Sequence, residues 1–365
     1  MRALFNTLAL SIILALAYLF AWPVEIKPVG WTSPVNLGYV RDFATNQKLE
    51  SFERLGMGDL TGPEAAVLSP DGSLIATSHE GWLVRWDDDQ QEGVPFVDVG
   101  GRPLGVDFDA QGNLWIANAY SGLMKLTALG ELSIELTEVD GIALRYADDL
   151  AVAPNGKIYL SDASTRFAAK DYDSTLAASL LDIMEHSDNG RIIEFDPSTG
   201  DAKVVLDNLT FANGVAADPL GRFIIVAETG EYRIWKHWIS GLNAGKSEII
   251  IDNLPGFPDN VHIGENGRYW VGLTAPRSEV LDDLSGEPFW RSVIQRLPEV
   301  MRPQVESYGL VFAIDENGNV LENLQSPSGS VYATTGVAES AKYIYVTSLT
   351  APFLARYKKS DLKIQ

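Results

Sequence analysis

Five positions that share one spacing carry most of the side chains that could bind a metal ion. Each lies eight residues before a glycine that follows a short turn, at Gly72, Gly112, Gly156, Gly221 or Gly267. These positions hold Glu64, Leu104, Asp148, Asn213 and Asp259. Four of the five residues carry a side-chain oxygen. Carboxylate and amide oxygens are the ligands of Ca²⁺, which takes about 6 to 8 of them.

The elements that position these residues follow from the same turns. Each glycine precedes a run of β-branched, aliphatic or aromatic residues, as at 114–117 and 223–226, which predicts a strand. A sixth run of this kind, at 343–348, lacks the glycine. Repeats of about 40 to 50 residues, each holding about four strands, are typical of a β-propeller. The sequence therefore predicts an all-β, six-bladed β-propeller.

The first strand of every blade lines the central channel of a propeller, so residues at one register converge on its axis. We therefore expect Glu64, Asp148, Asn213 and Asp259 to bind Ca²⁺ there, with Asn260 as a further ligand. Without a cation, the three carboxylates would repel one another and raise their own pKa values. The alternative is that Asp and Asn occupy these positions because they favour turns, and that the channel holds only water.

Composition narrows the possible functions. The chain has 365 residues and a net charge of −21, so it offers no basic surface for a nucleic acid. It has no cysteine, which excludes disulfides, thiolate metal ligands and a cysteine nucleophile. We expect a small-molecule partner, and the sequence does not predict the oligomeric state.

The N-terminus predicts a membrane anchor. Residues 4–22 carry no charge and follow Arg2, which favours a signal-anchor transmembrane helix over residues 1–23. A linker over 24–53 would then lead into a propeller over 54–365. The competing interpretation is a cleaved signal peptide ending near Ala15-Leu16-Ala17. Both interpretations place the propeller on the extracytoplasmic side, in a periplasm or in an extracellular or lumenal space.

Two long segments interrupt the repeat, at about 165–189 and 276–307. Both have apolar residues at helical spacing, and loops of this length are usually lids or binding loops. We expect them to lie over one mouth of the channel, with Phe289 and Trp290 as an apolar wall for a substrate. The alternative is helical decoration that covers the edge of a blade.

Several of these stretches together resemble the strictosidine synthase-like family, especially its adipocyte plasma membrane-associated branch. The stretches are 62–64, 101–105, 148–150, 159–162, 211–215, 255–260 and 348–354, and the likeness spans about residues 55–358. The resemblance implies a six-bladed propeller with Ca²⁺ in its channel, within a superfamily that includes gluconolactonases, senescence-marker proteins and paraoxonases. It implies Glu64, Asn213 and Asp259 as recurrent ligands and Asn260 as a paraoxonase-type ligand, and Asp148 stands where an Asn is usual.

Departures from the family pattern favour one chemistry. Thr334 or Thr335 stands where the alkaloid-forming members have a glutamate, which disfavours a strictosidine synthase-type lyase. Leu104 and Ala119 replace the histidine pair of the paraoxonases. We therefore expect a Ca²⁺-dependent hydrolase of esters or lactones, in which Asp148 or Asp259 takes a proton from water.

The substrate contacts expected for this hydrolase are Leu104, Phe289, Trp290 and Thr335. The main alternative is a non-catalytic, membrane-tethered propeller that binds a small ligand or a protein partner.

Overall fold

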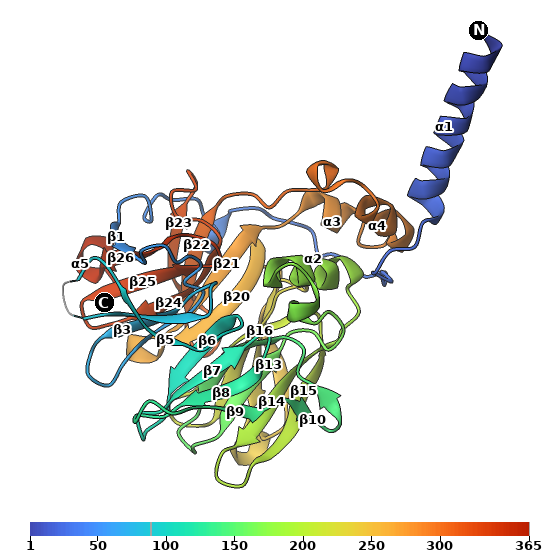
Figure 1. Ribbon diagram of the computed structural model, residues 1–365. Helices are drawn as coiled ribbons and strands as arrows, with labels where there is room; N and C mark the ends of the chain where they lie inside the picture. The colour runs from blue at the N-terminus through green and yellow to red at the C-terminus, as the bar shows by residue number, and fades with distance from the viewer. Residues whose placement is uncertain (88–89, 365) are drawn as a thin grey trace.

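The computed structural model describes residues 1–87 and 90–364. Within these residues the chain forms six four-stranded antiparallel sheets, which confirms the predicted six-bladed β-propeller (Figure 1). A separate two-stranded ribbon, β10 (Glu138–Val139) and β11 (Ile142–Ala143), precedes the third blade.

The blades follow one another along the chain, and each begins with its innermost strand. The first blade holds β2 (Ala66–Leu68), β3 (Leu74–Thr77), β4 (Trp82–Trp86) and β5 (Val94–Asp98). The second holds β6 (Pro103–Phe108), β7 (Leu114–Asn118), β8 (Gly122–Leu126) and β9 (Leu132–Leu136). The third holds β12 (Ala147–Val152), β13 (Ile158–Asp162), β14 (Gly190–Asp196) and β15 (Asp201–Leu209). The fourth holds β16 (Ala212–Ala217), β17 (Phe223–Glu228), β18 (Arg233–Trp238) and β19 (Ser247–Ile251). The fifth holds β20 (Gly256–Ile263), β21 (Tyr269–Pro276), β22 (Gly309–Ile314) and β23 (Val320–Ser326).

The sixth blade closes the propeller with strands from both ends of the domain. It holds β24 (Thr334–Glu339), β25 (Tyr343–Ser348) and β26 (Phe353–Lys358), and β1 (Glu53–Gly56) supplies its outermost strand. Leu55 of β1 pairs with Leu354 of β26, and both are buried in one apolar cluster. The short helix α5 (Lys359–Leu362) follows β26.

The innermost strands share a bulge that aims side chains at the channel. In blades two to six, two residues interrupt the regular pairing of the innermost strand with its neighbour, for example Asp148 and Asp149 between Ala147 and Leu150. Because a bulge turns side chains away from the normal alternation, the first residue of each pair can lie near the axis. These first residues are Leu104, Asp148, Asn213, Asp259 and Thr335.

Three helices lie at the end of the channel where the innermost strands begin. Helix α2 (Thr175–Glu185) connects the second and third strands of blade three, and α3 (Glu279–Asp283) and α4 (Pro288–Gln295) make the same connection in blade five. In an antiparallel blade, that connection lies at the same end as the start of the innermost strand. Figure 1 shows the three helices together on the side from which α1 projects. The two interruptions are therefore helical, as predicted.

Helix α1 (Arg2–Ala21) extends away from the propeller. Its segment Leu4–Ala21 is long and apolar enough to cross a membrane, and none of it is buried against the rest of the chain. Residues 24–52 connect α1 to β1 and lie along the domain surface. We call residues 24–34 of this connection the strap.

Candidate metal centre

Six side chains form a ring around the channel near the start of the innermost strands. One is Glu64, which lies two residues before the start of β2. The others are the five bulge residues Leu104, Asp148, Asn213, Asp259 and Thr335. All six are at most 6% exposed. Each blade thus contributes one residue to this ring, and the sequence spacing identified five of the six.

Hydrogen bonds join three blades at Glu64. The side-chain amide of Asn260 donates to Glu64 Oε1 over 2.8 Å and to the Glu64 backbone carbonyl over 3.1 Å. The Thr335 hydroxyl donates to the same carbonyl over 2.5 Å and contacts the Thr347 hydroxyl at 2.8 Å. Glu64 is therefore held in place by blades five and six, and Thr335 acts as a support for the ring.

Three oxygens of this cluster are buried and lack hydrogen-bond partners among the described residues. They are Glu64 Oε2, Asn213 Oδ1 and Asn260 Oδ1. Leaving a buried hydrogen-bond acceptor unpaired costs about 1 to 3 kcal/mol of folding free energy. Three such atoms in one cluster therefore indicate a site where a bound ion or water satisfies them. All three are hard oxygen donors of the kind that a Ca²⁺ ion takes.

Burial raises the pKa of all three carboxylates of the ring. Burial raises the pKa of Glu64 to about 7. Burial, followed by the charges of Glu64 and Asp259, raises the pKa of Asp148 well above its usual range. Burial and the charge of Glu64 likewise raise the pKa of Asp259. A divalent cation among them would reverse this effect by favouring the ionised forms.

The donor set fits a hard cation only when its amides are included. Among residues 1–87 and 90–364, no group of three or more His, Cys, Asp or Glu side chains has a metal-binding arrangement. Two of the unpaired oxygens belong to the amide side chains of Asn213 and Asn260. The set would therefore hold Ca²⁺ through carboxylates and amides together, with further ligands from water or substrate.

Two residues near the ring were not singled out from the sequence as site residues. Arg102 is fully buried, donates to the backbone carbonyls of Gly62 (3.1 Å) and Leu349 (3.3 Å), and its charge lowers the pKa of Glu64 and of Asp148. Tyr146 is buried, and after burial the charge of Asp148 contributes most to its raised pKa. Both lie within two residues of a ring position, which is the only signal the sequence offers for them.

An apolar roof covers the ring. Leu104 belongs to a buried cluster that also contains Tyr146, Phe211 and Leu281, together with Ile26 of the strap. The Tyr146 hydroxyl donates to the Thr175 carbonyl at the start of α2 over 3.0 Å. Leu104 is therefore the apolar member of the ring, and its expected contact with a substrate stays a prediction.

The strap crosses this roof between α2 and α3. The Val29 amide donates to the Glu185 carbonyl over 2.8 Å, and the Trp31 amide donates to the Ser285 carbonyl over 3.0 Å. The Trp31 ring stacks on His186 with a centroid separation of 4.0 Å. The segment expected as a linker is thus packed onto both insertions.

Phe289 and Trp290 do not join the ring. Both lie on α4, are 51% and 46% exposed, and contact Phe20 of α1 with ring centroids 6.0 and 6.2 Å apart. The pair therefore lies on the outer side of α4 next to α1, and its expected role as an apolar wall for a substrate stays a prediction. Helical spacing alone could not show which way α4 faces, because this depends on its packing against the strap.

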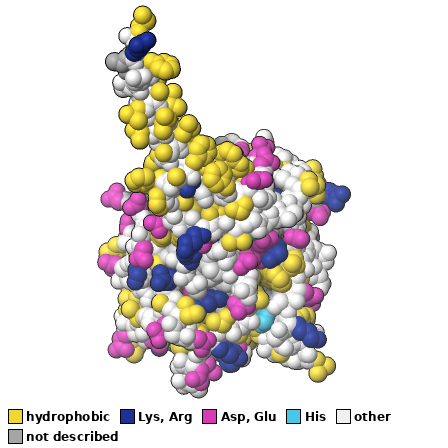
Figure 2. Space-filling model, turned by 90° about the vertical axis from the view of Figure 1, so that its right-hand side faces the viewer, with side chains coloured by type: hydrophobic (Ala, Val, Ile, Leu, Met, Phe, Trp, Pro, Cys, Tyr) yellow, Lys and Arg dark blue, Asp and Glu magenta, His cyan; other side chains and the backbone are white. Residues whose placement is uncertain are grey.

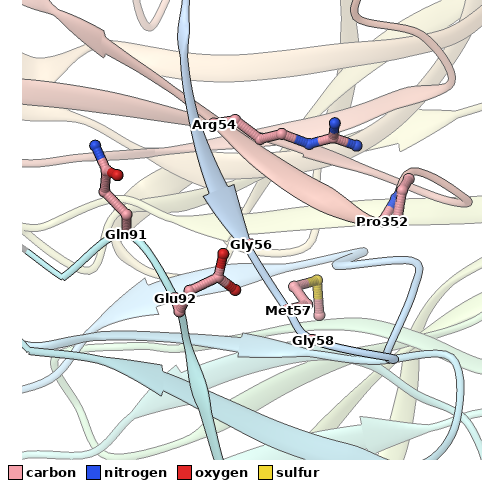
Figure 3. A pocket seen from close by; sticks show the side chains of 7 residues that line it. All are labelled: Arg54, Gly56, Met57, Gly58, Gln91, Glu92 and Pro352. Carbon is pink, nitrogen blue, oxygen red and sulfur yellow. The ribbon is translucent and has the colours of Figure 1, made fainter.

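Two pockets lie away from this roof. One, of about 220 Å³, is lined by all six innermost strands and includes His262, whose two ring nitrogens are buried without partners among the described residues. Its lining residues follow the ring residues along the strands, so it lies further down the channel. The other, of about 350 Å³, lies between β1 and the turn at Gln91 and Glu92 and contains none of the predicted site residues (Figure 3).

Sequence comparisons support the likeness over most of the chain. The strictosidine synthase family matches residues 148–242, and the strictosidine synthase-like N-terminal family matches residues 42–86. The adipocyte plasma membrane-associated protein of Homo sapiens is 33% identical over 97% of this chain and 89% of its own length. The bovine protein is 33% identical over 92% and 85%. Protein strictosidine synthase-like 13 of Arabidopsis thaliana is 35% identical over 63% and 57%.

Solved structures share the fold at low sequence identity. A gluconolactonase from Xanthomonas campestris superposes with a TM-score of 0.59 and 16% identity, over 83% of this chain and 91% of its own. A calcium-binding regucalcin from Agrobacterium tumefaciens gives 0.57 and 16%, over 84% and 93%. At this identity the likeness shows the fold alone. The near full-length relatives, however, show that this chain belongs to the strictosidine synthase-like family, with the adipocyte plasma membrane-associated proteins among its relatives.

Proposed function

We propose that this chain is a membrane-anchored, Ca²⁺-dependent hydrolase of esters or lactones. The observation that carries the proposal is the ring itself, where Glu64 Oε2, Asn213 Oδ1 and Asn260 Oδ1 are buried and unpaired among the described residues. A gluconolactonase and a calcium-binding regucalcin that share this fold support a lactone substrate and Ca²⁺. The membrane-associated relatives and the apolar α1 support an anchor.

The residues of the ring and its roof have three roles in this proposal: metal binding, proton transfer and exclusion of water. Glu64, Asn213, Asp259 and Asn260 hold the ion. When bound, Ca²⁺ would polarise the carbonyl or phosphoryl oxygen of the substrate. Asp148 takes the proton from the attacking water, because a cation beside it would favour the ionised carboxylate that burial otherwise disfavours. Leu104 and Tyr146 keep bulk water away from the reacting group.

The proposal also assigns a side of the membrane. Arg2 precedes the apolar span, and positive charge is retained on the cytoplasmic side. The propeller would therefore lie on the extracytoplasmic side. Protection of the propeller from a protease that has access to the extracytoplasmic face of the membrane would contradict this orientation.

The test uses the full chain in detergent or nanodiscs. Hydrolysis of phenyl acetate and of a γ-lactone is measured with Ca²⁺, after chelation and after Ca²⁺ is restored, and bound metal is quantified. We expect turnover to vanish and return with Ca²⁺. Asp148→Asn should lower kcat by about 100-fold or more while Ca²⁺ still binds, because a general base contributes about 10²- to 10⁴-fold.

A matched control separates the ring from burial as such. Asp182 of α2 is a fully buried carboxylate outside the ring, bonded to Ser164 and Asn189. Asp182→Asn should keep Ca²⁺-dependent turnover, whereas Asp259→Asn should weaken Ca²⁺ binding and turnover together. Unchanged Ca²⁺ binding and turnover in Asp259→Asn would contradict the assignment.

One observation favours a second candidate, a tethered propeller that binds a ligand or partner and uses Ca²⁺ only for stability. The ring is buried beneath the roof formed by Leu104, Ile26 and their neighbours, and a structural cation needs no access for substrate. A protein whose Tm rises with Ca²⁺, but which turns over no ester or lactone, would support this candidate over the hydrolase.

A further inference from the structure

Helix α4 buries a charged side chain and exposes two aromatic ones, which is unusual for a helix that packs on a soluble domain. Its one fully buried side chain is Arg291, which donates to the carbonyls of Met184 (3.1 Å), Ser285 (3.3 Å) and Val29. Its aromatic residues Phe289 and Trp290 instead point outward and are about half exposed. Because a helix on a water-exposed domain buries its apolar stripe, the outer side of α4 is suited to an apolar environment.

The outer side of α4 meets the end of α1. Phe20 stacks on Phe289, with rings inclined by 10°, and lies edge-on to Trp290. Arg296, which follows α4, donates to the carbonyls of Leu19 (3.1 Å) and Trp22 (2.5 Å). Phe20 belongs to the apolar span Leu4–Ala21. Rings that contact Phe20 therefore lie at the depth where the span leaves the bilayer, the usual place of aromatic side chains.

Exposed apolar residues continue beyond α4. We call them the outer patch, which consists of Val280, Phe289, Trp290, Val300, Met301 and Val305. Val300 and Met301 are 87% and 63% exposed. Arg302 folds this segment back onto α4 by donating to the carbonyls of Gln295 and Leu297. Figure 2 shows hydrophobic side chains along α1 that continue onto the adjoining end of the domain. A contiguous surface of this kind marks an interaction site.

We propose that the outer patch lies in the lipid–water interface of the membrane that holds α1, so that the ring-bearing end of the propeller faces the bilayer. This inference rests on the proposed anchoring through α1, but it does not depend on hydrolysis. The patch adds a second contact with the membrane, made by an amphipathic helix that lies in the interface. It also fixes the direction of the channel, which α1 alone would leave free.

The charges around the patch specify the type of lipid. The exposed ionisable residues of this insertion are mainly acidic: Glu279, Asp283, Glu287, Glu299 and Glu306. Two of its four arginines, Arg277 and Arg291, are buried. Such a surface is not attracted to anionic headgroups. Binding should therefore come from apolar insertion into a zwitterionic bilayer and change little with salt.

The absence of cysteine allows a direct test on the full chain. Single substitutions Val300→Cys and Met301→Cys receive a nitroxide spin label in phosphatidylcholine nanodiscs. Accessibility to oxygen, which concentrates in lipid, is compared with accessibility to a water-soluble nickel chelate. Leu129→Cys and Leu242→Cys are matched controls, because both leucines are more than 90% exposed in connections at the opposite end of the blades. Leu10→Cys in α1 reports the bilayer.

We expect the oxygen-to-nickel ratio at residues 300 and 301 to exceed that at 129 and 242 several-fold and to approach that at residue 10. The proposal would be overturned if the label at residue 10 lies in lipid while the labels at 300 and 301 are as accessible to the nickel chelate as those at 129 and 242. The anchor through α1 would stand in that case. A label at residue 10 in water would overturn both.

A second variant tests whether the aromatic pair holds the patch in place. The double substitution Phe289→Ser/Trp290→Ser in the Met301→Cys background should move the label at residue 301 towards water, with the label at residue 10 unchanged. Phe96→Ser is the control, because Phe96 is 40% exposed on β5 and lies outside the patch. An equal change with Phe96→Ser, or no change with the double substitution, would overturn the assigned role of the aromatic pair.

Discussion

Three buried carboxylates determine how the ring responds to protons and to metal. Glu64, Asp148 and Asp259 each lose hydration on folding, and Glu64 adds repulsion at both other sites. Arg102 supplies a nearby positive charge that lowers the pKa of Glu64 and Asp148. The metal-free ring therefore retains protons near neutral pH, and any cation that binds must displace them.

The metal-free protein should lose stability as the pH rises from about 5 to 8. The pKa of Glu64 is higher in the folded state, about 7, than its usual value of 4.5. Below the usual value both states are protonated, and the stabilisation is lost as the pH rises through the folded pKa. We expect a loss of about 1 to 3 kcal/mol, since one pKa unit corresponds to about 1.4 kcal/mol. Urea unfolding at several pH values measures it.

Two comparisons test the source of this loss. Glu64→Gln should flatten the pH dependence only in part. Asp148 and Asp259, whose pKa values are raised well above their usual range, will leave part of it. Asp107 and Asp182, whose pKa values burial raises to about 6 and 7, add to this remainder. Ca²⁺ should restore stability most at high pH, by about 2.7 kcal/mol at 100 times its Kd. A metal-free protein whose stability is flat or rises between pH 5 and 8 would contradict the prediction.

The ring could be predicted from the sequence, but its surroundings could not. Glu64, Asp148, Asn213 and Asp259 recur at one distance from a glycine turn, so the repeat itself identifies them. Arg102 lies outside that register, and its partners are the carbonyls of Gly62 and Leu349. The second partner is 247 residues away and becomes a neighbour only when the propeller closes. Nothing local in the sequence encodes such a contact.

At the level of elements, the bulge at the start of the innermost strands explains why the spacing produced a ring. The second bulge residue is Gly105 in blade two, Gly214 in blade four and Gly336 in blade six. A Cβ atom at Gly105 would lie 2.4 Å from Asp149 Oδ1, and one at Gly214 would lie 2.4 Å from the Asp259 carbonyl. These positions need glycine because adjacent innermost strands approach closely. Alternation predicts the strands, whereas the bulge depends on the partner strand.

The strap illustrates an element that the sequence did not predict as ordered. Residues 24–34 have neither helical nor strand periodicity, and their position comes from backbone bonds to Glu185 and Ser285. Arg291 adds a bond to the Val29 carbonyl. These partners lie at the end of α2, just after α3 and on α4, far along the chain. The strap therefore acquires its order from tertiary contacts and not from local propensity.

Trp31→Ala should loosen the strap. Trp31 stacks on His186 at 4.0 Å and contacts Tyr232 at 6.0 Å, so its loss removes two aromatic contacts. We expect the free energy of unfolding to fall by about 1 to 3 kcal/mol, less than for a fully buried tryptophan. Amide hydrogen exchange in residues 24–34 and in α2 should accelerate, and a chelator should remove Ca²⁺ several-fold faster because the roof opens.

The control for Trp31 is Trp82→Ala, which removes a half-buried tryptophan at the start of β4, away from the strap. That variant should lose stability without faster Ca²⁺ release. Equal rates of exchange in α2 for the two variants would contradict a closing role for the strap.

At the level of the whole molecule, closure joins the first and last blades. Repeated turns predicted the number of blades, but the sixth blade lacks the glycine and takes its outer strand from β1 at the start of the domain. Arg54 and Leu55 of β1 pair with Ala355 and Leu354. This pairing of β1 with β26 was not predictable, because β1 is only four residues long and its partner strand lies about 300 residues later in the chain. It pairs the edge of β26 that would otherwise be free.

Leu55→Ala should weaken this closure. Leu55 is 1% exposed and packs with Leu354, Trp86 and Met57, so truncation should lower the free energy of unfolding by about 2 to 5 kcal/mol. The matched control is Leu209→Ala, because Leu209 is equally buried on the outermost strand of blade three. Both variants should lose similar stability in urea unfolding.

The two leucine variants should differ in where the structure opens. Loss of β1 exposes the edge of β26, so Leu55→Ala should accelerate amide exchange in β25 and β26, far from blade three. Leu209→Ala should accelerate exchange only in β14 and β15, since the propeller stays closed there. Equal protection of β26 from amide exchange in both variants would mean that the blades hold together without β1. Packing between blades, and not the pairing of β1 with β26, would then keep the ring of Glu64 and Asp259 assembled.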